Sequence, residues 1–238
     1  MRLDVIEEIV EPADSKIVLL VLDGVGGLPR KKGRLTALEA AKTPNFDDLV
    51  EDGECGLQVP VGTGITPGSG PGNLGLFGYD PLRYRVGRGV LSGLGIGFEL
   101  QDNDVAARGN FCSVDADGTV TDRRAGRIST TKNEQLCELL REIDLPGAEL
   151  HVETVKEHRF LLVLRGENLS GDVSDTDPQE VGEKPHQPQA QNPDAGRTAA
   201  LVEQFVDQAG EVLAEEHPAN MVLLRGFSKR PNWPRFQQ

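Results

Sequence analysis

Ser69 combines a reactive side chain with a sequence context that suits phosphate chemistry. It lies in the run TPGSGPGNL, where glycines let backbone N–H groups approach an anion closely. If a helix begins at this serine, the helix N-terminus adds a favourable field for phosphate. A serine hydroxyl is a weak nucleophile that needs a base or a metal. No histidine lies nearby in the sequence, so a metal is favoured as the activator. The alternative is a plain glycine-rich turn.

Asp23 stands at the end of the apolar run KIVLLVLDG, residues 16–24. A short continuous apolar run of this kind predicts a strand buried on both faces of a parallel sheet. Ligands of open α/β sheets bind at the carboxyl ends of the strands, and a carboxylate is a good ligand for a hard divalent metal. Asp23 is therefore a candidate metal ligand. The alternative is an aspartate that caps a helix or forms a turn.

Arginines gather on or beside the strands that we expect in the second half of the chain. Their guanidinium groups match phosphate and carboxylate groups with two hydrogen bonds each, so this grouping predicts an anion-binding pocket. The alternative is salt bridging with the many acidic residues. His158 lies beside Arg159 at a predicted strand start, and this position is the sole reason to consider it as a substrate contact. The cations concerned are Arg108, Arg123, Arg124, Arg127, Arg159, Arg165, Arg225, Lys229 and Arg230.

The composition disfavours polyanionic partners. The 238 residues include 38 acidic and 25 basic side chains, for a formal net charge of -13, whereas non-specific nucleic-acid binding needs a basic surface. We therefore expect no nucleic-acid partner and no membrane partner. Cys55, Cys112 and Cys137 lack metal-binding spacing and are expected to be buried or idle thiols. The odd cysteine count and the absence of a signal peptide or long apolar run favour a cytoplasmic protein.

The elements that must position these residues follow from periodicity and turn chemistry. Thr43 and Pro44 predict a helix start, and Gly53 predicts its end. The DADG turn predicts a hairpin, and the glycine-rich run 61–81 predicts a turn that leads into a short helix. A parallel α/β beginning thus gives way to an α+β part. The other expected elements are strands at 16–24, 57–61, 148–166 (two strands) and 220–226, helices at 132–143 and 198–216, and a polar loop at 175–196.

With these residues in view, the chain resembles the archaeal-type, cofactor-independent phosphoglycerate mutases of the alkaline phosphatase superfamily. The resemblance runs over nearly the whole chain and is specific only when its motifs are taken together. They are VLDGVGGLP, LEAAKTPNFDDL, GTGITPGSGPGNLGLFGYDP, GRGVLSGLGIGFEL, DVAARGNF, DRRAGRI, EHRFLLVLRG, SDTDPQ and NMVLLRGFSKRP.

This resemblance implies a fold and a reaction. The fold class is α/β, a partial alkaline-phosphatase-like parallel-sheet core with an inserted α+β domain. Asp23 and Ser69 would bind one of two divalent metal ions, Mn²⁺ or Mg²⁺. Ser69 would take the phosphate of 3-phosphoglycerate and return it to the neighbouring hydroxyl to give 2-phosphoglycerate. The arginines of DRRAGR would hold this small phosphorylated three-carbon acid, and Arg108, Arg159, Arg225 and Lys229 are the further candidates.

Two departures from the family pattern limit these implications. Asn73 stands where many relatives have a histidine, and an amide cannot titrate. The chain also lacks the GDH motif and the other metal ligands of the second half of the core. An incomplete parallel sheet would expose an edge and an apolar face, so we expect poor stability or a need for a partner. That partner would be a complementary C-terminal half or a second copy of the chain.

The expected domains are residues 1–82, the first part of the metal-binding core; 83–230, the inserted substrate-binding domain; and 231–238, the start of the return to the core. Two alternatives to a mutase stay open. One is a catalytically incomplete remnant that binds an anionic metabolite. The other is a related metal-dependent phosphatase or phosphopentomutase-like enzyme, which the DRRAGR and VLRG motifs disfavour.

Overall fold

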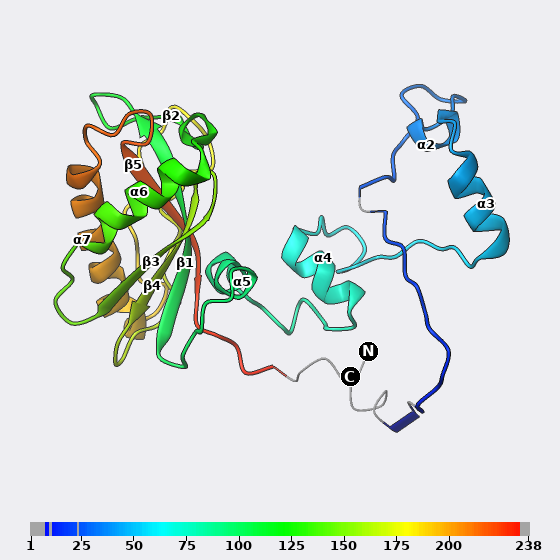
Figure 1. Ribbon diagram of the computed structural model, residues 1–238, viewed down its shortest axis with the longest axis horizontal. Coiled ribbons are helices and arrows are strands. Elements are labelled where there is room, and N and C mark those ends of the chain that lie inside the picture. The colour runs from blue at the N-terminus through cyan, green and yellow to red at the C-terminus, as the bar shows by residue number, and fades with distance from the viewer. Residues whose placement is uncertain (1–7, 10, 23, 234–238) are drawn as a thin grey trace.

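A five-stranded antiparallel sheet organises the second half of this computed structural model, which describes residues 8–9, 11–22 and 24–233 (Figure 1). The DADG hairpin and the two strands predicted within 148–166 are confirmed, as is the strand that begins near residue 220. The strands are β1 (Asp104–Val114), β2 (Val120–Asp122), β3 (Glu149–Lys156), β4 (Arg159–Arg165) and β5 (Met221–Ser228).

The DADG turn is stabilised by the side chain of its first aspartate, which accepts hydrogen bonds from backbone N–H groups inside the turn. The Asp115 carboxylate accepts hydrogen bonds from the backbone N–H groups of Asp117 and Thr119, at 3.0 and 2.9 Å. Gly118 has a φ of 79°, a left-handed conformation that glycine adopts without steric cost. The turn therefore fixes where β1 ends and β2 begins. It thereby determines the position of the arginines that follow β2.

Strand β1 is the centre of the sheet. It pairs with β4 along one edge and with β5 along the other, and β3 pairs with the far edge of β4, always antiparallel. In this register Arg108 lies directly opposite Arg225 of β5, and Asn110 lies directly opposite Arg159 of β4. The pairing thus brings together cations that are up to 117 positions apart in the sequence, counting from 108 to 225.

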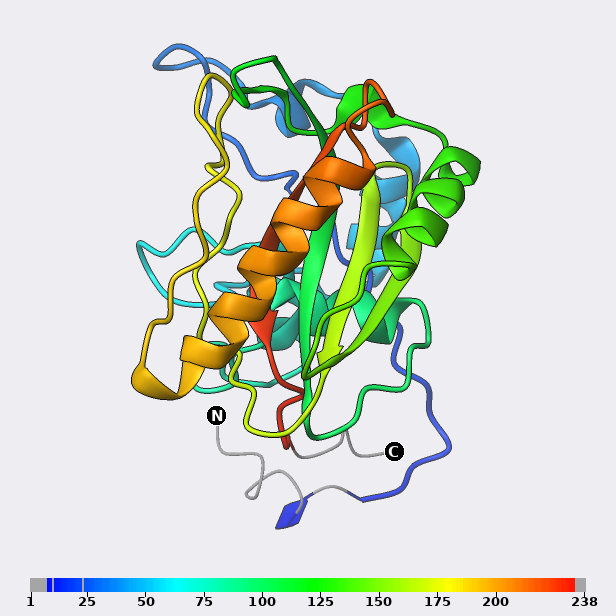
Figure 2. The same ribbon diagram turned by 90° about the vertical axis from the view of Figure 1, so that its left-hand side faces the viewer.

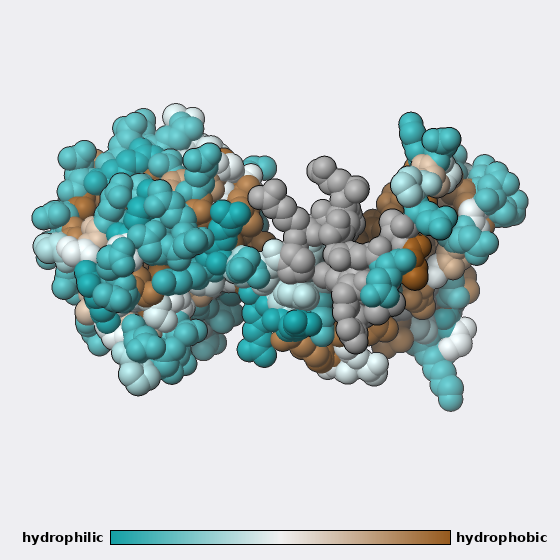
Figure 3. All heavy atoms as spheres, turned by 90° about the horizontal axis from the view of Figure 1, so that it is seen from below, coloured by the Kyte–Doolittle hydropathy of each residue, from teal (hydrophilic) through white to brown (hydrophobic). Residues whose placement is uncertain are grey.

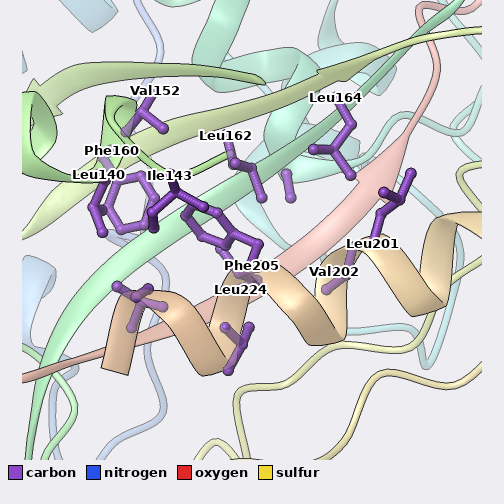
Figure 4. Close-up of a cluster of buried hydrophobic side chains, with 14 of the residues drawn as sticks. Leu140, Ile143, Val152, Phe160, Leu162, Leu164, Leu201, Val202, Phe205 and Leu224 are labelled. Carbon is purple, nitrogen blue, oxygen red and sulfur yellow. The ribbon is translucent and has the colours of Figure 1, made fainter. Parts of the chain in front are cut away.

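One face of the sheet carries the main apolar core. Helices α6 (Thr130–Arg141) and α7 (Gly196–Val212) cover it, close to the predicted helices at 132–143 and 198–216 (Figure 2). Alternate residues of β4, including Phe160 and Leu162, point toward Phe205 of α7 and are all but inaccessible to solvent (Figure 4). Burying each such side chain stabilises the fold by roughly 1.5–3 kcal/mol.

The opposite face of the sheet is only partly covered. Helix α5 (Arg88–Gly95) packs on it through Val90, which joins Ala106 and Leu161 in a second, smaller core. The helix approaches the strands closely because it has glycine at the contact: a Cβ on Gly89 would lie 2.2 Å from the carbonyl carbon of Ala106. The remainder of this face bears the arginines.

The chain before α5 forms short helices that Figure 1 shows lying away from the sheet. They are α2 (Ala37–Ala40), α3 (Pro44–Asp52) and α4 (Ser69–Leu76). The predicted helix start at Thr43 and Pro44 and its end at Gly53 are confirmed. A reciprocal pair of hydrogen bonds between Thr36 and Glu39, a capping box, starts α2.

The strands predicted at 16–24 and 57–61 are not formed. Residues 16–22 and 57–59 have no regular secondary structure, and Ile17 and Leu57 are almost fully exposed, at 95% and 102%. A parallel strand needs neighbours to satisfy its backbone groups, and no described strand pairs with either segment. The mixed helix and sheet class is confirmed, but the sheet within the described residues is antiparallel. Figure 3 shows the apolar surface gathered on the part of the chain before α5.

Several smaller expectations are also settled. The polar loop at 175–196 is confirmed; it contains the short 3-10 helix η2 (Pro193–Ala195). Cys112 and Cys137 are buried and Cys55 is exposed; burial raises the pKa of Cys137 to about 11, so this thiol is inert at neutral pH. In the part of the chain that the structure covers, no helix has the length and apolar character to cross a bilayer.

Candidate active site

Ser69 is the first residue of helix α4. Gly68 precedes it in an extended conformation, and the helix is eight residues long, so the glycine-rich run does lead into a short helix as predicted. The Ser69 side chain is exposed beside the helix N-terminus, where the peptide dipoles favour an anion. One turn later, the Asn73 side-chain amide donates a hydrogen bond of 2.8 Å to the Ser69 carbonyl oxygen. Asn73 therefore holds the backbone of the first turn, a role that needs no titration.

A hollow of about 490 Å³ opens beside Ser69. It lies between α4 and α5, since a Cβ on Gly70 would come within 3.0 Å of the Leu91 side chain of α5. Its lining is largely apolar, and its polar groups are on the side chains of Ser69, Asn73 and Tyr79. The lining residues are Ser69, Gly70, Asn73, Leu74, Phe77, Tyr79 and Leu91.

Helix α5 links this hollow to a group of cations on the open face of the sheet, which we call the arginine face: Arg88, Arg108, Arg123, Arg159 and Arg225. Burial lowers the pKa of Arg108, and the charges of Arg88, Arg159 and Arg225 lower it further. Arg88, Arg159 and Arg225 therefore lie close enough to Arg108 to repel its charge. This repulsion favours an anion between them.

Arg108 has no carboxylate partner among the described residues. Its Nε donates a hydrogen bond of 3.0 Å to the Ser92 hydroxyl, which in turn donates to the Arg88 carbonyl oxygen at 2.8 Å. This chain of bonds fixes the guanidinium against α5 without neutralising it. The remaining Arg108 donors are available to a ligand.

Arg123 and Arg225 share one buried carboxylate, that of Asp177. Arg123 donates two hydrogen bonds to it, from Nε to Oδ1 at 2.9 Å and from Nη2 to Oδ2 at 2.7 Å. The Nη1 atom of Arg225 lies 3.4 Å from Oδ2. Burial alone would raise the pKa of Asp177. The bonds from Arg123 and from the Gln179 N–H, with the charges of both arginines, outweigh burial and hold this pKa below its ordinary value.

Arg124 and Arg127 lie at the border of the arginine face, on and beside the 3-10 helix η1 (Ala125–Arg127). The Asp122 carboxylate shapes this turn by accepting bonds from the Arg124 and Gly126 N–H groups, at 2.8 and 2.7 Å. Both arginine side chains are exposed, and Arg127 lies 3.6 Å from Glu157. They are oriented less firmly than Arg123.

His158 is buried in the turn between β3 and β4. Burial, followed by the charge of Arg159, lowers its pKa to about 4, and the charges of Arg124 and Arg127 act in the same direction. The imidazole is therefore neutral at pH 7. Arg124, Arg127 and Arg159 thus all lie near this neutral ring.

The structure brings most of the predicted anion-binding residues together. Arg108, Arg123, Arg159 and Arg225 meet on one face, and Lys229 directly follows β5 with a half-buried side chain. Arg165 is excluded from this group, because Asp104 holds it in a bidentate pair at 2.7 and 2.9 Å.

Three residues of the arginine face and its surroundings were not predicted: Arg88, Ser92 and Asp177. Arg88 and Ser92 lie in GRGVLSGLG, and Asp177 lies in SDTDPQ, both of which contributed only to the family resemblance. A single arginine or aspartate in such a run has no characteristic spacing to other residues that would identify it as part of a site. Their association with the other cations appears only once β1, β5 and α5 are packed together.

The described residues do not fit a metal site on their own. They contain no group of three or more histidine, cysteine, aspartate or glutamate side chains that could hold a metal ion. Asp23 lies outside the described residues, and a single serine hydroxyl is not a sufficient donor set. No hydrogen bond or ion pair joins Ser69 to the arginine face within the described part of the chain.

Comparison with known proteins points to one family. A family model described as 2,3-bisphosphoglycerate-independent phosphoglycerate mutase matches residues 51–220. A probable enzyme of this name from Aquifex aeolicus is 47% identical over 99% of this chain and 60% of its own length. One from Thermus thermophilus is 50% identical over 98% of this chain and 58% of its own length. The chain thus spans about three fifths of these curated relatives.

Two solved structures are also similar. The cofactor-independent phosphoglycerate mutase from Thermoplasma acidophilum has a TM-score of 0.58 and 34% identity, over 68% of this chain and 47% of that one. A protein from Pyrococcus horikoshii has a TM-score of 0.61 and 29% identity, over 84% of this chain and 47% of that one. Both comparisons support the partial α/β fold that the sequence predicts.

Proposed function

Because this chain belongs to the 2,3-bisphosphoglycerate-independent phosphoglycerate mutase family, we propose that it carries the nucleophile and the anion-binding residues for interconversion of 3- and 2-phosphoglycerate. The observation that carries the proposal is the arginine face. Five arginines lie there, two of them paired with one buried carboxylate, and Arg108 is half-buried with its pKa lowered. Phosphoglycerate has a phosphate and a carboxylate, and each matches a guanidinium fork.

Ser69 is the proposed phosphate carrier. Its oxygen would form a bond to phosphorus as the bond between phosphorus and the substrate oxygen breaks. The serine gives up its proton and the released substrate oxygen gains one, so no net proton is consumed. The reverse transfer to the neighbouring hydroxyl would give the isomer. The N-terminus of α4 would stabilise the negative charge on the transferring group. The apolar hollow beside Ser69 would restrict water, which otherwise competes for the phosphate.

We further propose Asp23 and Ser69 as ligands of a divalent metal, Mn²⁺ or Mg²⁺, completed by residues outside the described part of this chain. The proposed domains are 1–82, 83–230 and 231–238, with the arginine face in the second of them. The protein is proposed to be cytoplasmic and to act with a complementary C-terminal half or a second copy. The exposed apolar segments at 17–22 and 57–59 favour such a partner over an isolated remnant.

An Arg108→Gln variant tests the proposed binding face. We expect it to bind 3-phosphoglycerate roughly 10- to 100-fold more weakly, because a hydrogen bond to a charged group is lost. The free protein should be no less stable than the unmodified chain, since the substitution relieves repulsion from Arg88, Arg159 and Arg225. Isothermal titration calorimetry measures the affinity, and urea unfolding measures the stability.

Arg141→Gln is the matched control. Arg141 lies on α6, pairs with Glu153 at 3.0 Å and is remote from the arginine face, but its substitution changes the net charge equally. It should leave binding within about twofold, since surface pairs contribute little. Equal loss of affinity in the two variants would refute a specific role for Arg108.

A further inference from the structure

We propose that Asp177 is a positioning residue, which holds Arg123 and Arg225 so that their remaining donors act together on a ligand with two anionic groups. The inference rests on the proposed function and deepens it. Asp177 itself would not touch the ligand. Its side chain is fully buried, and it acts through the two guanidinium groups.

The first support is the way that Asp177 is shared. Arg123 follows β2 and Arg225 belongs to β5, so the two arginines reach the same carboxylate from different elements. Bidentate pairing leaves a planar guanidinium little rotational freedom. One carboxylate therefore fixes the spacing between two cations that the sheet alone would leave free to splay apart by repulsion.

The second support is that Asp177 is itself rigidly held. The preceding residues lie along the outer edge of β5: the Thr176 N–H donates to the Leu224 carbonyl oxygen at 2.8 Å, and Asp175 accepts from the Gly226 N–H at 2.7 Å. The Gln179 N–H then donates to Asp177 Oδ1 at 2.9 Å. These bonds fix the position of the Asp177 carboxylate relative to β5, the strand that carries Arg225.

The third support is a donor that the structure leaves unused. The Arg225 Nε is buried and has no hydrogen-bond partner. A buried unsatisfied donor is costly, and such groups in native proteins call for an explanation. A ligand oxygen bound to the arginine face would accept a hydrogen bond from this Nε–H group. A purely structural role for the ion pair does not explain why the donor has no partner.

The chain contains a matched pair that has only a structural role. Asp104 is equally inaccessible and holds Arg165 with bonds of 2.7 and 2.9 Å, but it contacts one arginine and lies four positions along β1 from Arg108. Asp104→Asn and Asp177→Asn each break a buried bidentate pair. Their effects on stability should be similar, and their effects on ligand binding should differ.

The experiment compares two ligands by calorimetry on the full chain: 3-phosphoglycerate, with two anionic groups, and inorganic phosphate, with one. In Asp177→Asn, we expect affinity for 3-phosphoglycerate to fall by about 10- to 100-fold, since small errors in position are costly. Phosphate should bind as well as before or better, because the arginine face loses one negative charge. In Asp104→Asn the ratio of the two affinities should stay within about twofold.

Asp177→Glu is a second variant, which keeps the test valid if Asp177→Asn does not fold. It keeps the charge that both arginines need but moves it by one methylene, so we expect it to fold and still to lose preference for 3-phosphoglycerate by at least about fivefold. An unchanged affinity ratio in the Asp177 variants would overturn the inference while leaving the proposed function intact. Failure of the unmodified chain to bind 3-phosphoglycerate would overturn both.

Discussion

Replacing Ser69 by alanine is expected to lower the conversion of 3- to 2-phosphoglycerate by at least about 10³-fold, because the proposed phosphate carrier is removed. Ser69 is exposed and stands at the first position of α4, where alanine is well tolerated, so the fold should be unaffected. The measurement is a coupled assay that detects 2-phosphoglycerate, run on the full chain with Mn²⁺ added. Urea unfolding checks that the variant is as stable as the unmodified chain.

Thr66→Ala is the control for Ser69→Ala. Thr66 is an exposed residue with a hydroxyl in the same glycine-rich run, three positions earlier, and it lies before the first residue of α4. Its removal should leave the rate within about twofold, as expected for a surface substitution. Conversion that survives Ser69→Ala at the unmodified rate would rule out a phosphoserine on this residue.

Replacing Gly89 by alanine is expected to destabilise the fold by about 3 kcal/mol or more, although alanine is the better helix former. The added Cβ would lie 2.2 Å from both the carbonyl carbon and oxygen of Ala106 and 2.4 Å from the Ala107 nitrogen. These are backbone atoms of the central strand, so they cannot move aside as a side chain would. Helix α5 would have to lift, which would separate Val90 from its core and Ser92 from Arg108.

Gly95→Ala is the matched substitution in the same helix. No atom lies within 4 Å of the position that its Cβ would take. Helix propensity should therefore act alone and stabilise the protein by up to about 1 kcal/mol. Urea unfolding followed by far-UV circular dichroism gives both values. If the two variants shift stability in the same direction, α5 does not pack on β1 as described.

The elements that the sequence predicted correctly are those governed by local chemistry. The DADG hairpin follows from Asp115 and Gly118, and helix α3 follows from the Thr43–Pro44 start. The strands at 16–24 and 57–61 were wrong because apolar runs show what a segment could bury, not whether a neighbour is present. Pairing is a property of two segments, and here no described strand supplies the second one.

The site was predictable in part for the same reason. Residue type and position on the expected strands identified Arg108, Arg123 and Arg225, because guanidinium groups match phosphate and carboxylate. Their spatial grouping depends on the β1–β5 register and on the loop that delivers Asp177, and neither can be read from spacing. Asp23, the predicted metal ligand, lies outside the described residues and stays a prediction.

The central claim, that the arginine face binds phosphoglycerate, is tested most directly by NMR on the unmodified, ¹⁵N-labelled chain. The arginine Nε–H resonances would be followed while 3-phosphoglycerate is added. We predict saturable shifts for Arg108, Arg123 and Arg225, and unchanged resonances for Arg141 and Arg165, which pair with Glu153 and Asp104. Shifts that are absent, or that are equally large at Arg141 and Arg165, would contradict the claim.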